Sequence, residues 1–364
     1  MRIGVPREVK QDEYRVALLP VGAELLTRQG HEVVIESGAG EGSGFSNGDY
    51  AQAGAQIVSS AAALFAQSEL IVKVKEPQPQ EISLLQPHHV LFCYFHFAAS
   101  RELTQDCLNA GFTALAYETL FDDEGHLPLL QPMSEIAGKL SIQEGAKCLE
   151  KTFEGRGVLL GGVPGVEPAN VLVLGGGVVG TNAARMAAGL GANVIIMDVN
   201  LNRLRHLDEV MPANVTTLFS DPHTIRNAAL RADLVIGAVL IPGARTPVLL
   251  DAGLIRQMKT GAVLVDVGID QGGCAETSRP TTHQAPTYVV DGVVHYCVTN
   301  MPGVVSRTSS QALCNATLPY IRELAAEGVD QFLSRSAGRK ESLNMRGGRL
   351  TNAQLSSLFK DLPA

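Results

Sequence analysis

The chain of 364 residues carries little charge, because only 18% of it is Asp, Glu, Lys or Arg while 45% is hydrophobic. This composition excludes a disordered chain and suffices for a core in each of roughly two domains. Basic residues are also scarce: 29 of them stand against 37 acidic residues, for a net charge of −8, and they form no basic stripe. We therefore expect no nucleic acid among its partners.

Targeting features and long apolar runs are missing as well. The opening residues, MRIGVPREVK, lead into a polar segment without the apolar core of a signal peptide. No apolar stretch reaches the ~18 residues of a membrane span without a Gly or Pro break. The sequence predicts a cytoplasmic protein without a membrane partner.

Cysteine motifs are absent too, since no CxxC or Cys/His ligand spacing occurs. We expect reduced, packed thiols and no metal site, because most of the cysteines lie within apolar runs. They are Cys93, Cys107, Cys148, Cys274, Cys297 and Cys314.

What the chain does contain is a glycine turn within VLVLGGGVVGTNAARMAAGLGANVIIMD, residues 171–198. The pattern predicts a strand, a turn, a helix from near Val178 and a second strand. Gly175 would allow the tight turn, Gly177 would let the backbone approach a pyrophosphate, and Gly180 would let helix and strand pack closely. The first N–H groups of the helix would face the phosphates, so the segment predicts a dinucleotide site.

The second strand ends in a carboxylate, Asp198, which follows Gly180 by 18 residues. A carboxylate there accepts the adenosine ribose hydroxyls and repels a 2′-phosphate, which favours NAD over NADP. Arg203 lies close enough to weaken that exclusion. The alternative is a glycine turn that binds no ligand.

Short apolar strands alternate with helical stretches along the chain, which predicts an α/β fold with parallel sheets covered on both faces. The expected strands are 2–5, 32–36, 69–74, 89–95 and 113–117 in the first part, then 171–174, 194–198, 214–219, 233–238, 262–267 and 293–298.

Two long helices should connect the parts. The segment 134–155 has amphipathic spacing with Ser134 as a plausible N-cap, and the segment 309–334 is expected to be interrupted near Pro319. The second helix would return the chain to the first domain. We predict two Rossmann-like, doubly wound domains: residues 131–304 bind the dinucleotide, inserted between the two parts of a substrate domain, 1–130 and 305–364.

Polar residues at strand ends are the candidates for binding and moving a proton. Arg15 precedes an apolar run and could grip a carboxylate with two N–H groups, or be a solvated surface residue. Lys73 and Lys75 should share one strand face, and Lys75 is either functional or a solubilising edge charge. His96 ends the run VLFCYFHFAAS and is either a proton carrier or a packed core histidine.

The strand AVLVDVGID supplies two further carboxylates. Asp270 lies beyond the carboxyl end of the strand, where it could face a nicotinamide and orient a water molecule or share a proton with His96. Asp266 is better interpreted as a structural carboxylate.

With these residues assembled, the chain closely resembles the alanine dehydrogenase family from its first residue to about residue 330. The resemblance extends over many segments, among them HEVVIESGAGEGS, LIVKVKEP, HFAASRELT, PLLQPMSEIAG, GRGVLLGGVPGVEPANVLVLGGG, DLVIGAVLIPGA, VDVGIDQGGCAETSRPTTH and YCVTNMPGVVSRTSSQALCNATLPY. It implies reversible oxidative deamination of L-alanine to pyruvate and ammonia with NAD, in a cytoplasmic homohexamer.

The resemblance also implies residue roles. Arg15 and Lys75 would bind the substrate carboxylate, His96 would be the general acid/base, and Asp270 would position the attacking water. A small pocket would be lined by Tyr117, Met133, Asn300 and Met301. The family pattern places NAD contacts at Ser134, Gly175, Gly177, Val178, Val179, Gly180, Asp198, Arg203, Ser220, Val239, Leu240, Val267, Gly268, Ile269, Asp270, Arg279, Val298, Thr299, Asn300 and Met301.

Three other interpretations compete. The NAD(H)-binding part of a proton-translocating transhydrogenase shares this plan but works with membrane helices. A lysine- or saccharopine-type dehydrogenase needs a longer pocket. A non-catalytic NAD sensor has no need of Arg15, Lys75, His96 and Asp270 together.

Overall fold

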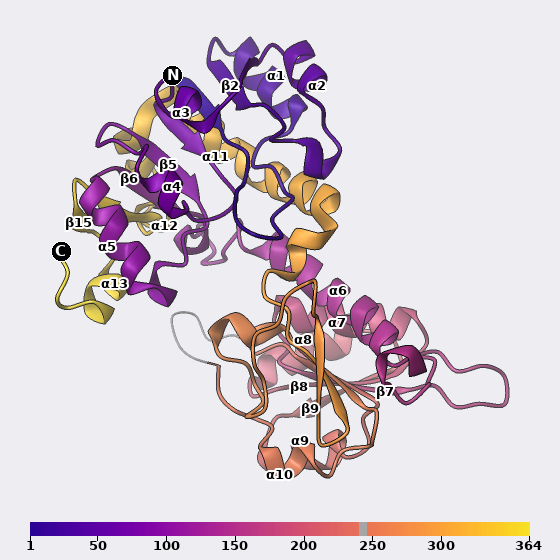
Figure 1. Ribbon diagram of the computed structural model, residues 1–364. Coiled ribbons are helices and arrows are strands. Elements are labelled where there is room, and N and C mark those ends of the chain that lie inside the picture. Colours follow the sequence, from indigo (N-terminus) through magenta and orange to yellow (C-terminus); the bar gives the residue numbers. More distant parts are fainter. Residues whose placement is uncertain (240–245) are drawn as a thin grey trace. The chain divides into compact units, whose positions relative to one another are not determined.

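The computed structural model describes residues 1–239 and 246–364, which divide into two compact units. Unit 1 comprises Met1–Met133 and Gly303–Ala364, and unit 2 comprises Ser134–Pro302. Both chain ends therefore belong to unit 1, to which residues 303–364, drawn in light orange to yellow, return (Figure 1). Each unit has its own sheet and its own apolar core. This confirms the predicted α/β class with two Rossmann-like sheets.

The described part of unit 1 contains an eight-stranded sheet in the order β15-β14-β6-β5-β4-β1-β2-β3. Strands β1 to β6 pair in parallel in the doubly wound order 3-2-1-4-5-6, and β14 and β15 add an antiparallel edge. Their bounds are β1 Arg2–Val5, β2 Glu32–Glu36, β3 Gln56–Val58, β4 Leu70–Val72, β5 Val90–Cys93, β6 Thr113–Ala116, β14 Leu343–Arg346 and β15 Arg349–Leu350.

Unit 2 repeats this plan, with a seven-stranded sheet among its described residues in the order β12-β13-β11-β10-β7-β8-β9. All neighbours are parallel except β12 and β13. The strand order reverses between β7 and β10, which is where open α/β sheets bind ligands. The bounds are β7 Asn170–Leu174, β8 Asn193–Asp198, β9 Val215–Phe219, β10 Leu234–Gly237, β11 Val263–Asp266, β12 Thr287–Val290 and β13 Val293–Tyr296.

Helices connect the strands of both sheets. Unit 1 contains α1 Pro20–Arg28, α2 Asn47–Gln52, α3 Ala61–Phe65, α4 Pro79–Ile82, α5 Arg101–Ala110, α11 Ser306–Ser334, α12 Ala337–Lys340 and α13 Ala353–Leu358. Helix α6, Gln131–Cys148, begins at the end of unit 1 and continues into unit 2, which also holds α7 Val178–Gly189, α8 Leu201–Val210, α9 Pro222–Ala229 and α10 Ala252–Ile255. Short 3₁₀ turns are η1 Glu41–Ser43, η2 Phe97–Ala99, η3 Tyr117–Thr119, η4 Lys151–Phe153, η5 Val267–Gln271 and η6 Met301–Val305.

Two helix predictions were wrong in detail. Ser134 is not an N-cap, because α6 already begins at Gln131. The next residue, Pro132, suits the first turn of a helix, where backbone N–H groups have no partner within the helix and a residue without an N–H loses nothing. The late helix is not interrupted at Pro319, which lies inside α11; the helical conformation breaks at Gly328, where φ is +79°. Glycine adopts that conformation at little steric cost, whereas Pro319 removes only one backbone donor.

Four short strands of the structure were not predicted from the sequence. Strand β3 has only three residues, and β12, β14 and β15 lie at antiparallel sheet edges, where the apolar pattern is weak. Conversely, β4 ends at Val72 and β5 at Cys93, so both stop before the residues we expected them to reach.

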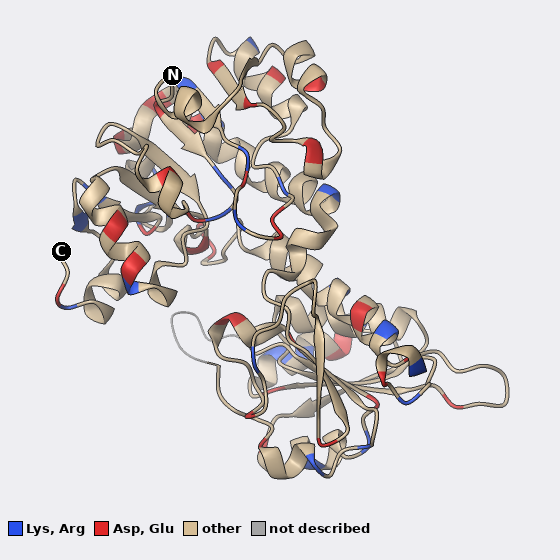
Figure 2. Ribbon diagram, viewed as in Figure 1, with Lys and Arg blue, Asp and Glu red and all other residues tan. Residues whose placement is uncertain are grey.

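The cores are apolar and the cysteines belong to them. All six thiols are free and buried, as predicted. Basic and acidic positions are interspersed over the ribbon of each unit (Figure 2). Within the part of the chain that the structure describes, none of the helices combines the length and apolarity of a membrane span.

Candidate active site

The glycine turn links β7 to α7 at the point where the strand order of unit 2 reverses. Gly175 has φ of +101°, the conformation that the tight turn requires. A Cβ added at Gly180 would lie 1.8 Å from the Gly175 carbonyl oxygen, so only glycine permits this packing. A Cβ at Gly177 would meet no atom within 4 Å, so the backbone there is open to an approaching group. Helix α7 begins at Val178, as predicted, and its N-cap is Gly177, which has no side chain to cap the first N–H groups.

The middle glycine of the turn, Gly176, is held from both sides. Its N–H donates to Oδ2 of Asp198 at 2.8 Å, and its carbonyl accepts from Nε of Arg203 at 2.6 Å. Arg203 also donates to Oγ1 of Thr181 at 2.8 Å. The carboxylate expected to bind the ribose therefore lies against the glycine turn, and the arginine fixes the turn's backbone.

The other predicted cofactor residues of unit 2 follow strand ends or lie near them. Arg279 stacks its guanidinium over the Tyr288 ring, with its Cζ 4.3 Å from the ring centroid. Ser134 lies in α6 rather than at a strand end. Ser220 follows β9, Val239 follows β10, the run Val267, Gly268, Ile269 and Asp270 lies in η5 after β11, and Val298, Thr299, Asn300 and Met301 follow β13. Leu240 lies outside the described residues.

In unit 1, Arg15 is buried, not solvated, with 3% of its surface exposed. Its Nε donates to Oε1 of Glu13 at 2.6 Å and its Nη2 to Oε2, so Glu13 occupies one edge of the guanidinium. Nη1 lies 3.1 Å from the sulfur of Met133. Glu13 and Met133 thus fix the orientation of the Arg15 guanidinium.

The backbone on either side of Arg15 is fixed by two buried serines. Ser310 of α11 accepts the Val16 N–H at 2.9 Å, and Ser43 donates to the Tyr14 carbonyl at 3.0 Å. The two hydroxyls are 2.8 Å apart. Residues from two distant segments of unit 1 thus hold the Arg15 segment in place.

The two lysines after β4 do not share a strand face, because the strand ends at Val72. Lys73 is fully buried, and its Nζ donates to Glu81 at 2.7 Å and to Glu8 at 3.1 Å. Glu8 also accepts the Val74 N–H at 2.6 Å, so this ion-pair cluster fixes the segment that carries Lys75. Lys73 is therefore structural.

Lys75 and His96 lie close enough for their charges to interact. Lys75 is buried with 9% of its surface exposed, which argues against a solubilising edge charge. Desolvation and then the positive charges of Lys75, Lys10 and Arg15 lower the pKa of His96 below its usual value. The imidazole is accordingly neutral at pH 7 and able to accept a proton. Unit 1 thus brings Arg15, Lys75 and His96 together beyond the carboxyl ends of adjacent strands.

His96 keeps one side open to solvent, and its other side rests on buried aromatic rings, which is where its desolvation arises. The ring of Tyr94 stacks on the imidazole with their centroids 5.9 Å apart, and the Tyr94 hydroxyl donates to the Leu129 carbonyl. Tyr117 lies edge-on to Tyr94 and Phe92 and is fully buried. Its hydroxyl has no hydrogen-bond partner among the described residues.

The two carboxylates of η5 and its flank have different environments. Asp266 is fully buried, and its Oδ2 accepts from the Cys274 N–H at 2.8 Å and from the Ser278 hydroxyl at 2.6 Å, consistent with a structural role. Burial raises its pKa despite these hydrogen bonds. Asp270, four residues later, is exposed at the end of the loop that Asp266 fixes.

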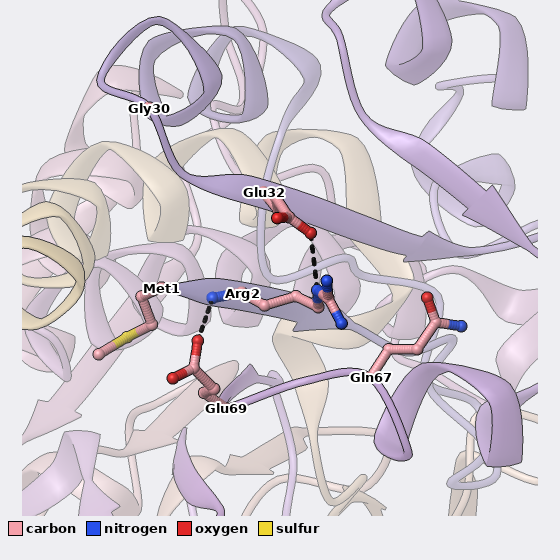
Figure 3. A pocket seen from close by; sticks show the side chains of 6 residues that line it. All are labelled: Met1, Arg2, Gly30, Glu32, Gln67 and Glu69. Atoms are coloured by element: carbon pink, nitrogen blue, oxygen red, sulfur yellow. Dashed lines mark hydrogen bonds and ion pairs between the residues drawn. The ribbon is translucent and has the colours of Figure 1, made fainter.

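Two cavities lie at the amino ends of the strands, opposite the ends that carry the candidate residues. A cavity of about 200 Å³ is formed at the amino ends of β1, β2 and β4, where Arg2 donates through its backbone N–H to Glu69 and through its Nε to Glu32 (Figure 3). A second cavity, of about 340 Å³, lies at the amino ends of β7, β8 and β9. Neither adjoins the strand ends that carry the candidate residues. Among the described residues no cluster of His, Cys, Asp or Glu could hold a metal ion.

Sequence reasoning missed the residues that hold the candidates in place: Glu8, Glu13, Ser43, Glu118 and Ser310. Glu118 alone carried a usable signal, because it directly follows a predicted strand, as Lys75 does.

Comparison with known proteins agrees with this geometry. Residues 4–137 match the family described as "Alanine dehydrogenase/PNT, N-terminal domain", and residues 141–353 match its C-terminal domain. The alanine dehydrogenase of Halomonas elongata is 52% identical over 99% of this chain and 97% of its own length. That of Bacillus subtilis is 50% identical over 96% of this chain and 93% of its own.

Solved structures give the same result. An L-alanine dehydrogenase superposes with a TM-score of 0.95 at 52% identity and 99% coverage of both chains. A transhydrogenase from Sinorhizobium meliloti shares the fold, with a TM-score of 0.82 at 23% identity over 97% of this chain and 99% of its own. Since its matches span both domains and nearly the full length of several relatives, the chain belongs to the alanine dehydrogenase/PNT family.

Proposed function

We propose that this chain is an NAD-dependent L-alanine dehydrogenase, which catalyses the reversible oxidative deamination of L-alanine to pyruvate and ammonia. The observation that carries the proposal is the grouping of Arg15, Lys75 and His96 in unit 1, in a chain about half identical over nearly its whole length to proteins named alanine dehydrogenase. A proton carrier beside two cationic groups suits an amino acid substrate, whose carboxylate needs binding and whose amine must lose a proton.

The residues of unit 2 fit a dinucleotide. The open backbone at Gly177 and the uncapped start of α7 suit a pyrophosphate, and the Asp198 carboxylate has lone pairs left for ribose hydroxyls after accepting two backbone N–H groups. We assign the cofactor as NAD, which when bound supplies the hydride acceptor for the substrate Cα. The further contacts are proposed at the predicted positions that follow the strand ends.

In unit 1 each side chain has a distinct task. Arg15, oriented by Glu13, binds the substrate carboxylate together with Lys75. His96, neutral at pH 7, takes a proton from the substrate and returns it in the reverse direction. We propose that Asp270 orients the water that attacks the imine carbon, that Met133 and Tyr117 restrict the substrate to a small side chain, and that Asn300 binds the substrate.

The activity test is the growth of NADH absorbance when L-alanine and NAD⁺ are mixed with the protein at alkaline pH. A panel with glycine, L-serine, 2-aminobutyrate and L-lysine measures selectivity, and weak activity on the small homologues is expected because one methylene changes binding by only ~1–3 kcal/mol. No rate above the blank with any small amino acid would overturn the proposal. A preference for L-lysine would favour the lysine- or saccharopine-type reaction.

Replacing Asp198 by alanine should weaken NAD⁺ binding and reduce the discrimination against NADP⁺. The carboxylate would no longer accept ribose hydroxyls or repel a 2′-phosphate. The measurement is kcat/KM for both cofactors. Because Asp198 also accepts the Gly176 N–H, the Asp198→Asn variant, which keeps an acceptor but removes the charge, is the matched control. An unchanged cofactor ratio in both variants would refute the assignment.

We also propose a homohexamer, as the family resemblance implies. Three exposed apolar side chains, Leu159, Val163 and Val166, support a subunit contact, and they lie in the segment between η4 and β7. That segment projects from unit 2 as a long loop (Figure 1). Light scattering should give the mass of six chains of 38.6 kDa each. The mass of a single chain would contradict this.

A further inference from the structure

We propose that Glu118 is a positioning residue for the proton carrier: its carboxylate binds the backbone N–H groups of Phe95 and His96 and so fixes where the imidazole projects. The inference rests on the proposed function for the role of His96. It adds a residue that acts through another one, without touching the substrate.

The contact joins the ends of two neighbouring strands. Strands β5 and β6 pair in parallel, with Cys93 opposite Ala116, and each is followed directly by an irregular turn. Glu118 belongs to the turn η3, which follows β6. Its Oε1 accepts the His96 N–H at 2.6 Å and the Phe95 N–H at 3.1 Å, and its Oε2 lies 3.3 Å from the Phe95 nitrogen. Two successive N–H groups thus converge on one carboxylate oxygen, as in the backbone anion sites called nests.

The conformation of His96 explains why an anchor is needed. His96 has φ of +51° and ψ of +39°, in the left-handed region that residues with a Cβ rarely adopt. A glycine would adopt this conformation without the hydrogen bonds from Glu118, but it would lack the imidazole that the proposed proton transfer needs. The carboxylate compensates by stabilising the one backbone conformation that leads from β5 into η2.

Electrostatics around Glu118 are consistent with an anionic acceptor. Burial raises the pKa of Glu118 to about 7, while the hydrogen bonds from the backbone, including those of His96 and Phe95, and the charge of Lys75 lower it. At the alkaline pH of the activity assay the carboxyl group is therefore ionised. Lys75, whose charge lowers the pKa of His96, thus stabilises the ionised Glu118 carboxylate that accepts the His96 N–H.

A positioning role can be separated from a role in proton transfer. Since Oε1 alone accepts both N–H groups at the shorter distances, the amide oxygen of a glutamine can replace it. A glutamine cannot carry a proton between groups. Positioning therefore predicts that Glu118→Gln preserves turnover and Glu118→Ala does not, whereas a proton relay predicts that both variants fail.

The first experiment compares the steady-state kinetics of Glu118→Ala and Glu118→Gln with the parent, and uses Glu102→Ala, which removes an exposed carboxylate of α5, as the control. We expect kcat to fall roughly 100-fold in Glu118→Ala, the size of effect that a misplacement of about 1 Å produces. Glu118→Gln should stay within about fivefold of the parent, and KM for NAD⁺ should be unchanged in both. A Glu118→Ala variant as active as the parent, or a Glu118→Gln variant as impaired as Glu118→Ala, would overturn the proposal.

The second experiment needs no substrate, so its outcome is independent of the proposed function. Amide hydrogen exchange at Phe95 and His96 is followed in the full-length protein without alanine or cofactor. Loss of a charged acceptor should speed exchange at both amides by about 10- to 100-fold in Glu118→Ala, and glutamine should restore most of the protection. Equal exchange in all variants would overturn the proposal that Glu118 holds the Phe95 and His96 N–H groups, even if the enzyme oxidises alanine.

Should Glu118→Ala fail to fold, Glu118→Asp takes its place in both experiments. Aspartate keeps the charge but is shorter by one methylene, so it cannot reach both N–H groups as Glu118 does. Faster exchange and a lower kcat in Glu118→Asp than in Glu118→Gln are then expected. The reverse order would show that charge rather than the position of the acceptor matters, and would overturn the proposal.

Discussion

Replacement of His96 by alanine is expected to lower kcat roughly 10²- to 10⁴-fold, the contribution usual for a general acid/base. The physical reason lies in the surroundings of the ring: desolvation and the charges of Lys75, Lys10 and Arg15 lower its pKa, so the parent protein presents a neutral imidazole near pH 7. Among the described side chains of unit 1 that we place in the site, His96 is the only imidazole.

Binding of NAD⁺ should be unchanged in this variant, because the glycine turn and Asp198 belong to unit 2. Calorimetric titration with NAD⁺ measures the binding and a stopped-assay rate measures turnover. Added imidazole should restore part of the rate, since it replaces the missing proton carrier and nothing else. His126→Ala, which removes an exposed imidazole of unit 1, is the matched control. A His96→Ala protein within a few-fold of the parent would place the proton carrier elsewhere.

The second large effect concerns stability. Replacement of Lys73 by methionine is expected to lower the free energy of unfolding by about 3–5 kcal/mol, because Glu8 and Glu81 would remain buried without their cation. Urea unfolding measures the change. Lys340→Ala, which removes an exposed lysine of unit 1, should alter the unfolding free energy by less than about 0.5 kcal/mol.

The loss should also depend on pH. Burial raises the pKa of Glu8 to about 7 even beside Lys73, and without the lysine this pKa rises further. The folded protein then holds a proton that the unfolded chain, with an ordinary glutamate pKa, has released. The unfolding free energy of Lys73→Met relative to the parent should therefore fall as the pH rises above about 7, where Glu8 of the parent has released its proton and Glu8 of the variant has not. Equal unfolding of both proteins across that range would show that the cluster contributes no net stability.

Local steric demands explain why the glycine turn could be predicted. Gly175 is required by the conformation of one turn, and Gly180 by the short distance between helix α7 and the turn that precedes it. Both requirements involve only a few neighbouring residues. The strand-end rule likewise led to Arg15, Lys75 and His96, because parallel strands bring their carboxyl ends to one edge of a sheet.

Contacts between distant segments explain the failures. The period of two assigned Lys73 and Lys75 to one face, but the strand stops at Val72 and Lys73 turns toward two carboxylates from other segments. The pairing of Ser310 with the Arg15 segment joins residues nearly a full chain length apart. The left-handed conformation of His96 has no local signature either, because such turns are predicted from glycine or asparagine.

The path of the chain through unit 1 has a kinetic consequence. Unit 2 is one continuous stretch of the chain, so it can fold as soon as residue 302 has been synthesised. Unit 1 cannot be completed until the end of the chain has been synthesised. Leu115 of β6 pairs with Leu343 of β14, and the Val16 N–H donates to Ser310. A growing chain should therefore complete unit 2 before unit 1, and folding of unit 1 should be the slower step because it closes the longest loop.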